Sequence, residues 1–264
     1  MWVKLVVGAL AGLGVAAGAA FGAAQSVSHG DVRARITWDA NHYPPNLHLT
    51  IRRSGETVFS DFVADLRHRR QRYPAQAYSF RRQAVQIRRL DRGGEPEVVL
   101  LLWWGGAHCC FFTRVYRYDP DSDRYRVRTL FHGDLIPTYK DRERDGRTEI
   151  WAEDWRFAYA FTGFSDSVFP IRIYRYAAEG FDVITRRYKH AIRRDARRNL
   201  RIYRRFAGGP RDVEGALAAY VADQYLLGRR RRGWRKVQSA QRAGHVSPRF
   251  DRRLRRFLRR KGYG

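Results

Sequence analysis

The sequence predicts an α+β protein, with a body of antiparallel β-repeats followed by a basic helical module. Two observations predict this architecture. A short string occurs twice, as Arg114–Tyr118 and Arg172–Tyr176, and each copy follows an acidic, glycine-containing segment that ends in a glutamate. Apolar residues alternate with a period of two before Arg186 and recur with a period of about 3.6 after it. A repeated unit cannot bury its own apolar face, so the units are expected to stack on a neighbour.

An uncharged run near the N-terminus is typical of an export signal. Residues 5–24 are mostly Ala, Gly, Val and Leu, and the small residues before Gln25 fit a cleavage site. The run is also long enough to cross a bilayer, so an N-terminal anchor is the alternative for residues 1–24. In both cases we expect the rest of the chain to be secreted or extracytoplasmic, in an oxidising environment.

Residues 25–83 are expected to form an N-terminal β-meander. Period-two alternation predicts strands, separated by turn-forming residues, at Val32–Trp38, Leu47–Arg52 and Thr57–Phe62. The segment Asp65–Tyr78 is rich in Arg and Gln, and it fits either a short helix or an exposed loop.

Residues 84–185 are expected to form two β-repeats. The first has predicted strands at Ala84–Leu90, Glu97–Trp104, Cys109–Tyr118 and Tyr125–Phe131. The second has predicted strands at Ile150–Ala152, Phe157–Phe161, Pro170–Tyr176 and Phe181–Thr185. Three or four short strands per unit, with roughly 50 to 60 residues between units, is the scale of a propeller blade. Two units cannot close a ring, so we expect an incomplete, stacked assembly that the first meander completes.

Residues 186–264 are expected to form four helices. Tyr188 begins an i, i+4 apolar stripe that ends before Gly208. Asp212 can cap a second helix, a third is predicted over Trp234–Ala243, and Ser247 with Pro248 has the signature of a fourth helix start.

The positive charge is concentrated in this helical segment. The net charge of the chain is +26, and residues 186–264 hold 26 Lys and Arg against 5 Asp and Glu. Such a module suggests an anionic partner, which could be a cell-surface polymer, lipid headgroups or nucleic acid. The export signal and the lack of a known reading motif argue against specific nucleic-acid binding. A solvated helical surface without a partner is the alternative.

The acidic turn of the second repeat has the spacing of a calcium loop. Carboxylate oxygens fall at positions 1, 3, 5 and 9, glycine stands at position 6, and position 7 can offer its carbonyl; the residues are Asp141, Glu143, Asp145, Arg147 and Glu149. The turn lacks the position-12 glutamate of an EF-hand and is flanked by strands. A hairpin turn whose acidic residues pair with nearby arginines is the alternative. The first repeat keeps only Asp91 and Glu97, so calcium is expected in the second loop only.

The chain has two cysteines, Cys109 and Cys110, which are adjacent. A vicinal disulfide is one interpretation, and Gly105 and Gly106 just before it make a tight turn plausible. Two reduced, buried thiols and a metal or redox site with His108 are the other two.

No motif for catalysis is evident in the sequence. It has no nucleophile elbow, zinc-protease helix or phosphate-binding glycine loop, and its histidines are scattered. Glu153, Asp154 and Asp166 lie near aromatic segments, and we expect each to be solvated or paired with arginine. The alternative is a secreted hydrolase, with a cleft between the sheet and the helical module that gathers His108 with Asp154 or Asp166.

Residues 84–185 resemble secreted bacterial proteins with FG-GAP or VCBS-type repeats. The resemblance is carried by the acidic glycine turns that lead into apolar strands and by the stretch Gly105–Cys110. The segments 222–228 and 257–263 are similar to the helical extension of such proteins. The resemblance implies propeller-like blades, calcium in intact acidic loops, and extracellular binding or scaffolding, and it implies no particular enzyme. Arg89 and Gly93 depart from the pattern in the first loop, and Glu143 departs from the usual aspartate in the second. We therefore expect a monomeric, non-enzymatic binding or scaffold protein.

Overall fold

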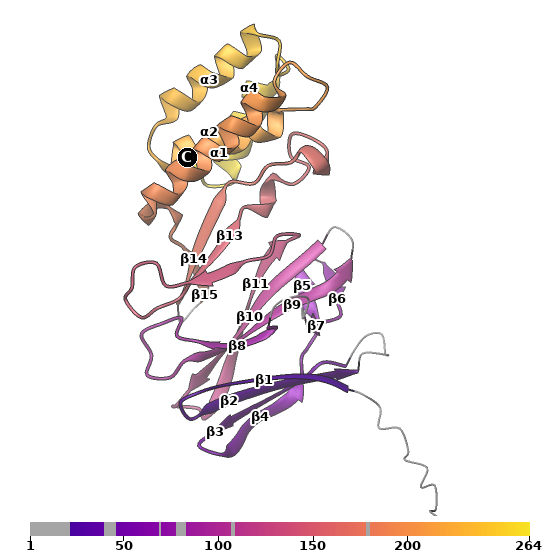
Figure 1. Ribbon diagram of the computed structural model, residues 1–264, viewed down its shortest axis with the longest axis vertical. Helices are drawn as coiled ribbons and strands as arrows, with labels where there is room; N and C mark the ends of the chain where they lie inside the picture. Colours follow the sequence, from indigo (N-terminus) through magenta and orange to yellow (C-terminus); the bar gives the residue numbers. More distant parts are fainter. Residues whose placement is uncertain (1–21, 40–45, 69, 78–82, 107–108, 178–179) are drawn as a thin grey trace, which may run out of the picture.

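The computed structural model describes residues 22–39, 46–68, 70–77, 83–106, 109–177 and 180–264 (Figure 1). It shows the α+β class that the sequence predicts, with antiparallel sheets followed by four helices. The first sheet contains β1 (Gly22–His29), β2 (Val32–Asp39), β3 (His48–Arg53) and β4 (Glu56–Phe62). The second contains β7 (Gln76–Ala77), β8 (Val85–Arg88), β9 (Glu97–Gly106), β10 (Cys109–Asp119) and β11 (Arg124–Gly133). The third contains β12 (Thr138–Lys140), β13 (Glu149–Glu153), β14 (Ile171–Ala177) and β15 (Gly180–Val183).

The three sheets follow one another along the molecule, and the helices lie at the end formed by the third sheet (Figure 1). The core between the first two sheets includes Ile36 and Leu49 on one side and Leu100 and Phe112 on the other. A smaller cluster joins the second sheet to the third and includes Val99 and Tyr176. Strand β9 is therefore buried on both faces, which explains why its sequence is a continuous apolar run and does not alternate.

The two repeats have the same strand pairing. Tyr116 of the first copy faces Val98 across β9 and β10, and Tyr174 of the second faces Ile150 across β13 and β14. Tyr118 and Tyr176 likewise pair with Tyr125 and Phe181 of the next strand. The repeated string thus occupies the third strand of a four-stranded antiparallel unit in both copies. No closed propeller is formed by the described sheets.

Two local predictions need correction, and one strand was not predicted. Residues Phe157–Phe161 are not a strand: Trp155–Phe157 forms a 3₁₀ turn, and the fourth strand of the second repeat is β12, which the sequence analysis missed. The reason is that Phe157 and Phe161 are buried among the helices. The undecided segment Asp65–Tyr78 is neither helix nor simple loop, because it holds the hairpin β5 (Leu66–His68) and β6 (Gln71–Tyr73) followed by β7.

The predicted N-terminal export signal lies almost wholly outside the described residues. Residues 1–21 are not described, and Ala23 and Ala24 belong to β1, where they pair with Trp38 and Thr37. The signal peptide and the anchor therefore both stay predictions. Among the described residues, no helix is long and apolar enough to cross a membrane.

All four predicted helices are present in the C-terminal module. They are α1 (Lys189–Phe206), α2 (Glu214–Leu226), α3 (Arg230–Arg242), which begins before the predicted Trp234, and α4 (Phe250–Arg260). Helix α2 is the central one, since all its residues from Glu214 to Gln224 are buried. A Cβ at Gly215 would lie 2.7 Å from the carbonyl oxygen of Asp166, so glycine lets α2 approach this loop of the third sheet closely.

The helical module is docked on the third sheet through the carboxylate of Asp154. This side chain is 1% exposed and accepts hydrogen bonds from Arg156 Nε at 2.7 Å, Arg172 Nη1 at 3.0 Å and the hydroxyl of Tyr263 at 2.8 Å. Arg156 also donates to the carbonyl oxygen of Lys261 at 3.0 Å. The contact therefore joins β13, β14 and the segment after α4.

Aromatic packing reinforces this docking. The ring of Phe157 lies 4.8 Å from that of Phe257 and 5.8 Å from that of Tyr263. Phe161 contacts Phe250 and Phe257 at 5.7 Å and 5.0 Å. The helical core is thus completed by a loop of the third sheet, and the two parts are expected to unfold together.

Replacing Asp154→Asn is expected to lower the free energy of unfolding by about 3 kcal/mol, because two guanidinium groups would lose the carboxylate that neutralises them inside the protein. Urea unfolding measures this. Asp166→Asn is the matched control: Asp166 pairs with Arg211, its side chain is 22% exposed, and the expected loss is below about 1 kcal/mol. Equal losses in the two variants would contradict the docking role of Asp154.

Candidate functional site

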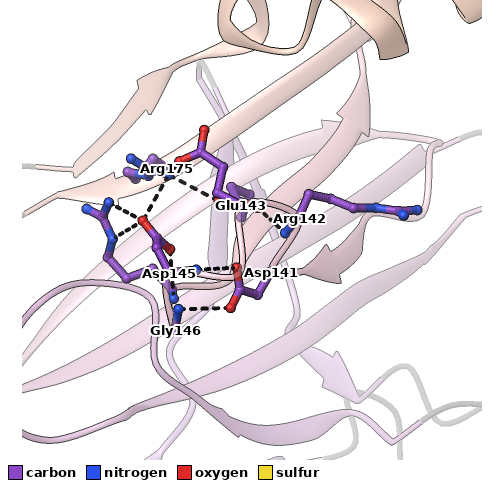
Figure 2. Close-up of polar contacts among 8 residues, drawn as sticks. Asp141, Arg142, Glu143, Asp145, Gly146 and Arg175 are labelled. Carbon is purple, nitrogen blue, oxygen red and sulfur yellow. Dashed lines mark hydrogen bonds and ion pairs between the residues drawn. The ribbon is translucent and has the colours of Figure 1, made fainter.

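The acidic turn of the second repeat brings three of its predicted ligands together. Carboxylate oxygens of Asp141, Asp145 and Glu149 lie within 4.8 Å of one another. Asp141 accepts hydrogen bonds from the backbone of Asp145 at 3.2 Å and of Gly146 at 2.9 Å, so the turn folds around this side chain (Figure 2). Gly146 has a φ of +80°, which accounts for glycine at position 6 of the loop.

A positive side chain of the protein already contacts this cluster. Arg175, in the second copy of the repeated string, donates through Nη2 to Glu143 at 2.9 Å (Figure 2). The same Nη2 atom donates to Glu149 at 3.1 Å. Hydrogen bonding to Arg175 holds the pKa of Glu143 below its ordinary value, and hydrogen bonding to Arg147 does the same for Asp145. Arg147 contacts Asp145 with its side chain. Calcium binding at this turn stays a prediction, and a calcium ion bound here would have to compete with Arg175 for Glu149.

The turn of the first repeat has the same framework. Arg117 pairs with Asp91 at 2.7 Å, as Arg175 pairs with Glu143. The backbone of Leu90 donates to Glu97 at 2.7 Å, as the backbone of Arg142 donates to Glu149 at 3.1 Å. The two turns are neighbours, since the amide of Thr148 donates to the carbonyl oxygen of Arg89 at 2.7 Å. An arginine–carboxylate pair is thus a common element of both units.

Glu97 is the strongly perturbed carboxyl group of the first turn. It is 1% exposed, and its Oε1 atom has no hydrogen-bond partner. Burial raises the pKa of Glu97 to about 7, because the charged form loses its hydration.

The cysteine pair lies at the start of β10. Cys110 is fully buried. The strand register shifts between Cys109 and Phe111, so β10 begins with an irregularity. The side chain of Cys109 and the whole of His108 lie outside the described residues. The vicinal disulfide therefore stays a prediction, and so does the site with His108.

The carboxylates considered for catalysis do not converge. Asp154 is held by Arg156, Arg172 and Tyr263, whereas Asp166 pairs with Arg211 on the surface at 2.6 Å. Burial raises the pKa of Asp154, but the hydrogen bond from Arg156 and the charge of Arg172 outweigh it and hold that pKa below its usual value. Asp154 therefore behaves as a structural anion.

A cleft lies between the third sheet and α1, and the alternative prediction of a hydrolase requires a cleft between the sheet and the helical module. Its volume is about 600 Å³, and its polar lining includes Glu153, Asp195 and Arg198. Arg198 bonds Glu153 at 2.7 Å and Asp195 at 3.0 Å, so both carboxylates are already paired. Asp154 and Asp166 are not among the residues that line this cleft.

A buried polar group behind this cleft was not predicted. Asn199 donates to Asp223 at 2.9 Å, and Asp195 accepts from the backbone of Ile171 at 2.8 Å. Burial raises the pKa of Asp223 well above its ordinary value, and one of its carboxyl oxygens has no partner. An aspartate in an otherwise apolar run, such as Asp223 after Val221 and Ala222, was the signal in the sequence. These contacts fix α1 against α2 and the third sheet.

The remaining candidate is the charged surface of α3 and α4. Every arginine from Arg229 to Arg260 is exposed, and Asp251 is the one acidic residue in that range. Among the described residues, the single ion pair formed by these arginines joins Arg253 to Glu214. The apolar sides of these helices, including Val237, Leu254 and Phe257, face the core. We refer to the exposed arginines of this range as the α3–α4 arginines.

Comparison with known proteins gives two matches. The family described as the sll0997 C-terminal domain matches residues 192–262, which run from α1 to the segment after α4. The chain is 27% identical over 160 residues to a "Probable thylakoid lumen protein sll0997" of Synechocystis sp. (strain ATCC 27184 / PCC 6803 / Kazusa). The match covers 58% of this chain and 46% of the relative, so the chain spans about half the length of the curated relative it matches. No solved structure matches.

Substituting Arg175→Gln is expected to increase the effect of calcium on the melting temperature, because it removes the cation that contacts Glu143 and Glu149. The measurement is the difference in melting temperature between calcium and chelator, compared within each variant. Adding Asp141→Asn to this variant is the control and should abolish the calcium effect. If calcium does not change the melting temperature of Arg175→Gln, the turn does not bind calcium and its carboxylates are held by arginines alone.

The pH dependence of stability is expected to differ between the parent chain and Glu97→Gln. The folded pKa of Glu97 is raised to about 7, so the folded state binds more protons than the unfolded one between about pH 4.5 and 7. The stability of the parent relative to Glu97→Gln should therefore fall by roughly 2 to 3 kcal/mol as pH rises through this range. Urea unfolding at several pH values measures the difference.

The comparison with a variant is necessary because His132 acts in the opposite direction. Burial lowers the pKa of His132 to about 3, so this group destabilises the fold as pH falls below the ordinary histidine value of about 6.5. Its contribution is common to both chains and cancels in the difference. A difference that does not change with pH would disprove the assignment to Glu97.

Proposed function

We propose that this chain is an extracytoplasmic, non-enzymatic binding or scaffold protein, which attaches to an anionic surface through the α3–α4 arginines. The surface would be lipid headgroups or an anionic cell-surface polymer. In this proposal the three stacked sheets form the body, and the helical module presents the charge.

The observation that carries the proposal is a difference in ion pairing between the arginines of the β-sheet body and the α3–α4 arginines. In the β-sheet body, Arg53, Arg117, Arg126 and Arg175 each pair with a carboxylate. Of the α3–α4 arginines, by contrast, Arg253 alone has a carboxylate partner among the described residues. Positive charges that repel one another oppose folding, and an anionic partner would relieve this repulsion.

The helical framework also suits such a partner. The apolar sides of α3 and α4 are buried in the core, so the arginines lie on the outer sides of ordered helices. Aromatic rings hold some of them: the guanidinium of Arg255 lies 3.8 Å from the centre of the Trp234 ring, and that of Arg230 lies 5.0 Å from the Tyr225 ring. Less side-chain entropy is then lost when these groups bind.

Two observations support an extracytoplasmic location. Residues 5–24 have the composition of an export signal. The relative is named as a probable thylakoid lumen protein, and the lumen is a compartment outside the cytoplasm. We extend the location to this chain as part of the proposal.

The FG-GAP or VCBS character of the repeats, with calcium in the second loop, belongs to the same proposal. Its support is the same antiparallel pairing of β8 to β11 and of β12 to β15, together with the closely spaced carboxylates of Asp141, Asp145 and Glu149. The family match, over residues 192–262, lies outside the repeats.

Neutralising four arginines of α4 (Arg255, Arg256, Arg259 and Arg260, each replaced by Gln) is expected to lower the salt concentration at which the protein elutes from heparin. It should also weaken flotation with vesicles that contain phosphatidylglycerol. Flotation without heparin retention would identify lipid headgroups, and the reverse would identify a polymer.

Two control variants test whether position matters as well as charge. The same four residues replaced by Lys keep the charge and should bind as the parent does. Replacing Arg193, Arg197, Arg204 and Arg205 of α1 by Gln makes the same charge change on another exposed helix and should have a smaller effect. Equal effects of the α1 and α4 variants would show nonspecific attraction and refute a defined α3–α4 surface.

A further inference from the structure

A second cavity, separate from the cleft under α1, is lined in part by five basic side chains. Its volume is about 710 Å³, and it lies where β14, β15 and the 3₁₀ turn Thr185–Arg187 meet the ends of α2 and α4. The basic residues that line it are Arg156, Arg172, Arg186, Arg187 and Lys261. Asp182 is the one carboxylate among the lining residues.

Three of these guanidinium groups are held in place by the protein itself. Asp154 binds Arg156 and Arg172, whose side chains are nonetheless 32% and 20% exposed. Arg186 donates to the carbonyl oxygens of Tyr225 at 3.1 Å, Leu226 at 3.3 Å and Tyr263 at 3.3 Å. A guanidinium group has five N–H donors, so each can hold its protein partner and still offer donors to a ligand.

The charges of this cavity do not cancel. Asp154 offsets one of the two arginines that it binds, and Asp182 is the one carboxylate that lines the cavity beside five basic groups. Arg187 is exposed and forms no ion pair among the described residues. The cavity therefore keeps an excess of positive charge around ordered, planar donors, which is the arrangement that recognises phosphate oxygens.

The cavity also has an apolar side. Val183, Ile184 and Leu226 line it next to the arginines, and Val183 is 51% exposed. A volume of about 710 Å³ falls within the range of small-molecule sites and is larger than a bare phosphate ion needs. The lining thus suits a phosphate group that carries a small organic part.

We propose that this cavity binds a phosphate ester through Arg156, Arg172, Arg186, Arg187 and Lys261, with the organic part against Val183 and Leu226. The ligand is either a free small organophosphate or the headgroup of a phospholipid. This inference does not depend on the α3–α4 arginines, because none of those residues lines the cavity.

The experiment measures binding of glycerol 3-phosphate and inorganic phosphate by calorimetry at constant ionic strength. Val183→Glu places a negative charge at the cavity without removing a buried side chain, and Val183→Thr keeps the branched shape as its control. Arg187→Ala removes an exposed lining charge, and Arg193→Ala, on α1, is its matched control. We expect Val183→Glu and Arg187→Ala to bind roughly tenfold more weakly, while both controls bind as the parent does.

A second measurement separates the two sources of phosphate. Stronger flotation of Val183→Thr than of Val183→Glu with phosphatidylglycerol vesicles would identify a lipid headgroup. Equal flotation, together with binding of glycerol 3-phosphate that Val183→Glu weakens, would identify a free organophosphate. The proposal would be overturned if the protein bound neither glycerol 3-phosphate nor inorganic phosphate and if Val183→Thr and Val183→Glu floated equally. Equal binding of soluble phosphate by all four variants would also overturn it.

Discussion

The packing of the C-terminal half depends on one buried carboxylate, that of Asp154. A charge in this position is stable because Arg156, Arg172 and Tyr263 surround it with hydrogen-bond donors. These partners come from three separate segments, so the carboxylate fixes the third sheet, its aromatic loop and the end of the chain in one arrangement. The same contact orders the two arginines that line the basic cavity. Arg156 and Arg172 therefore have both a structural role, in packing, and a proposed role in binding phosphate.

Arginine–carboxylate pairing is also the element that the two repeats have in common. Arg117 and Arg175 occupy the same position in the repeated string and reach the acidic turn of their own unit. The turns have diverged around this pair: the second keeps three closely spaced carboxylates, while the first keeps the buried Glu97. Arg175 therefore lies beside the position at which a calcium ion would have to bind. Whether calcium or Arg175 neutralises the carboxylates of the turn depends on the local charge and not on loop spacing alone.

Ion pairing also distinguishes the sheets from the α3–α4 arginines. Several acidic side chains of the sheets and of the docking contacts pair with arginines. Of the α3–α4 arginines, Arg253 alone pairs with a carboxylate among the described residues, and the apolar sides of these helices are buried. The arginine-rich composition thus gives both a basic helical surface and a basic cavity. The surface suits an extended anionic partner, and the cavity suits a small phosphate ester.

The sequence by itself determined the order and type of most elements, because period-two and period-3.6 patterns, glycine stops and the duplicated Tyr-Arg-Tyr string are local signals. It also located the charge in the last four helices. Tertiary structure alone decided that Phe157 and Phe161 belong to the helical core, that Arg175 contacts the acidic turn, and that Asp154 meets Tyr263 across more than a hundred residues. These contacts could not be predicted because they depend on which surfaces meet after the sheets stack, and no local period or spacing records that choice.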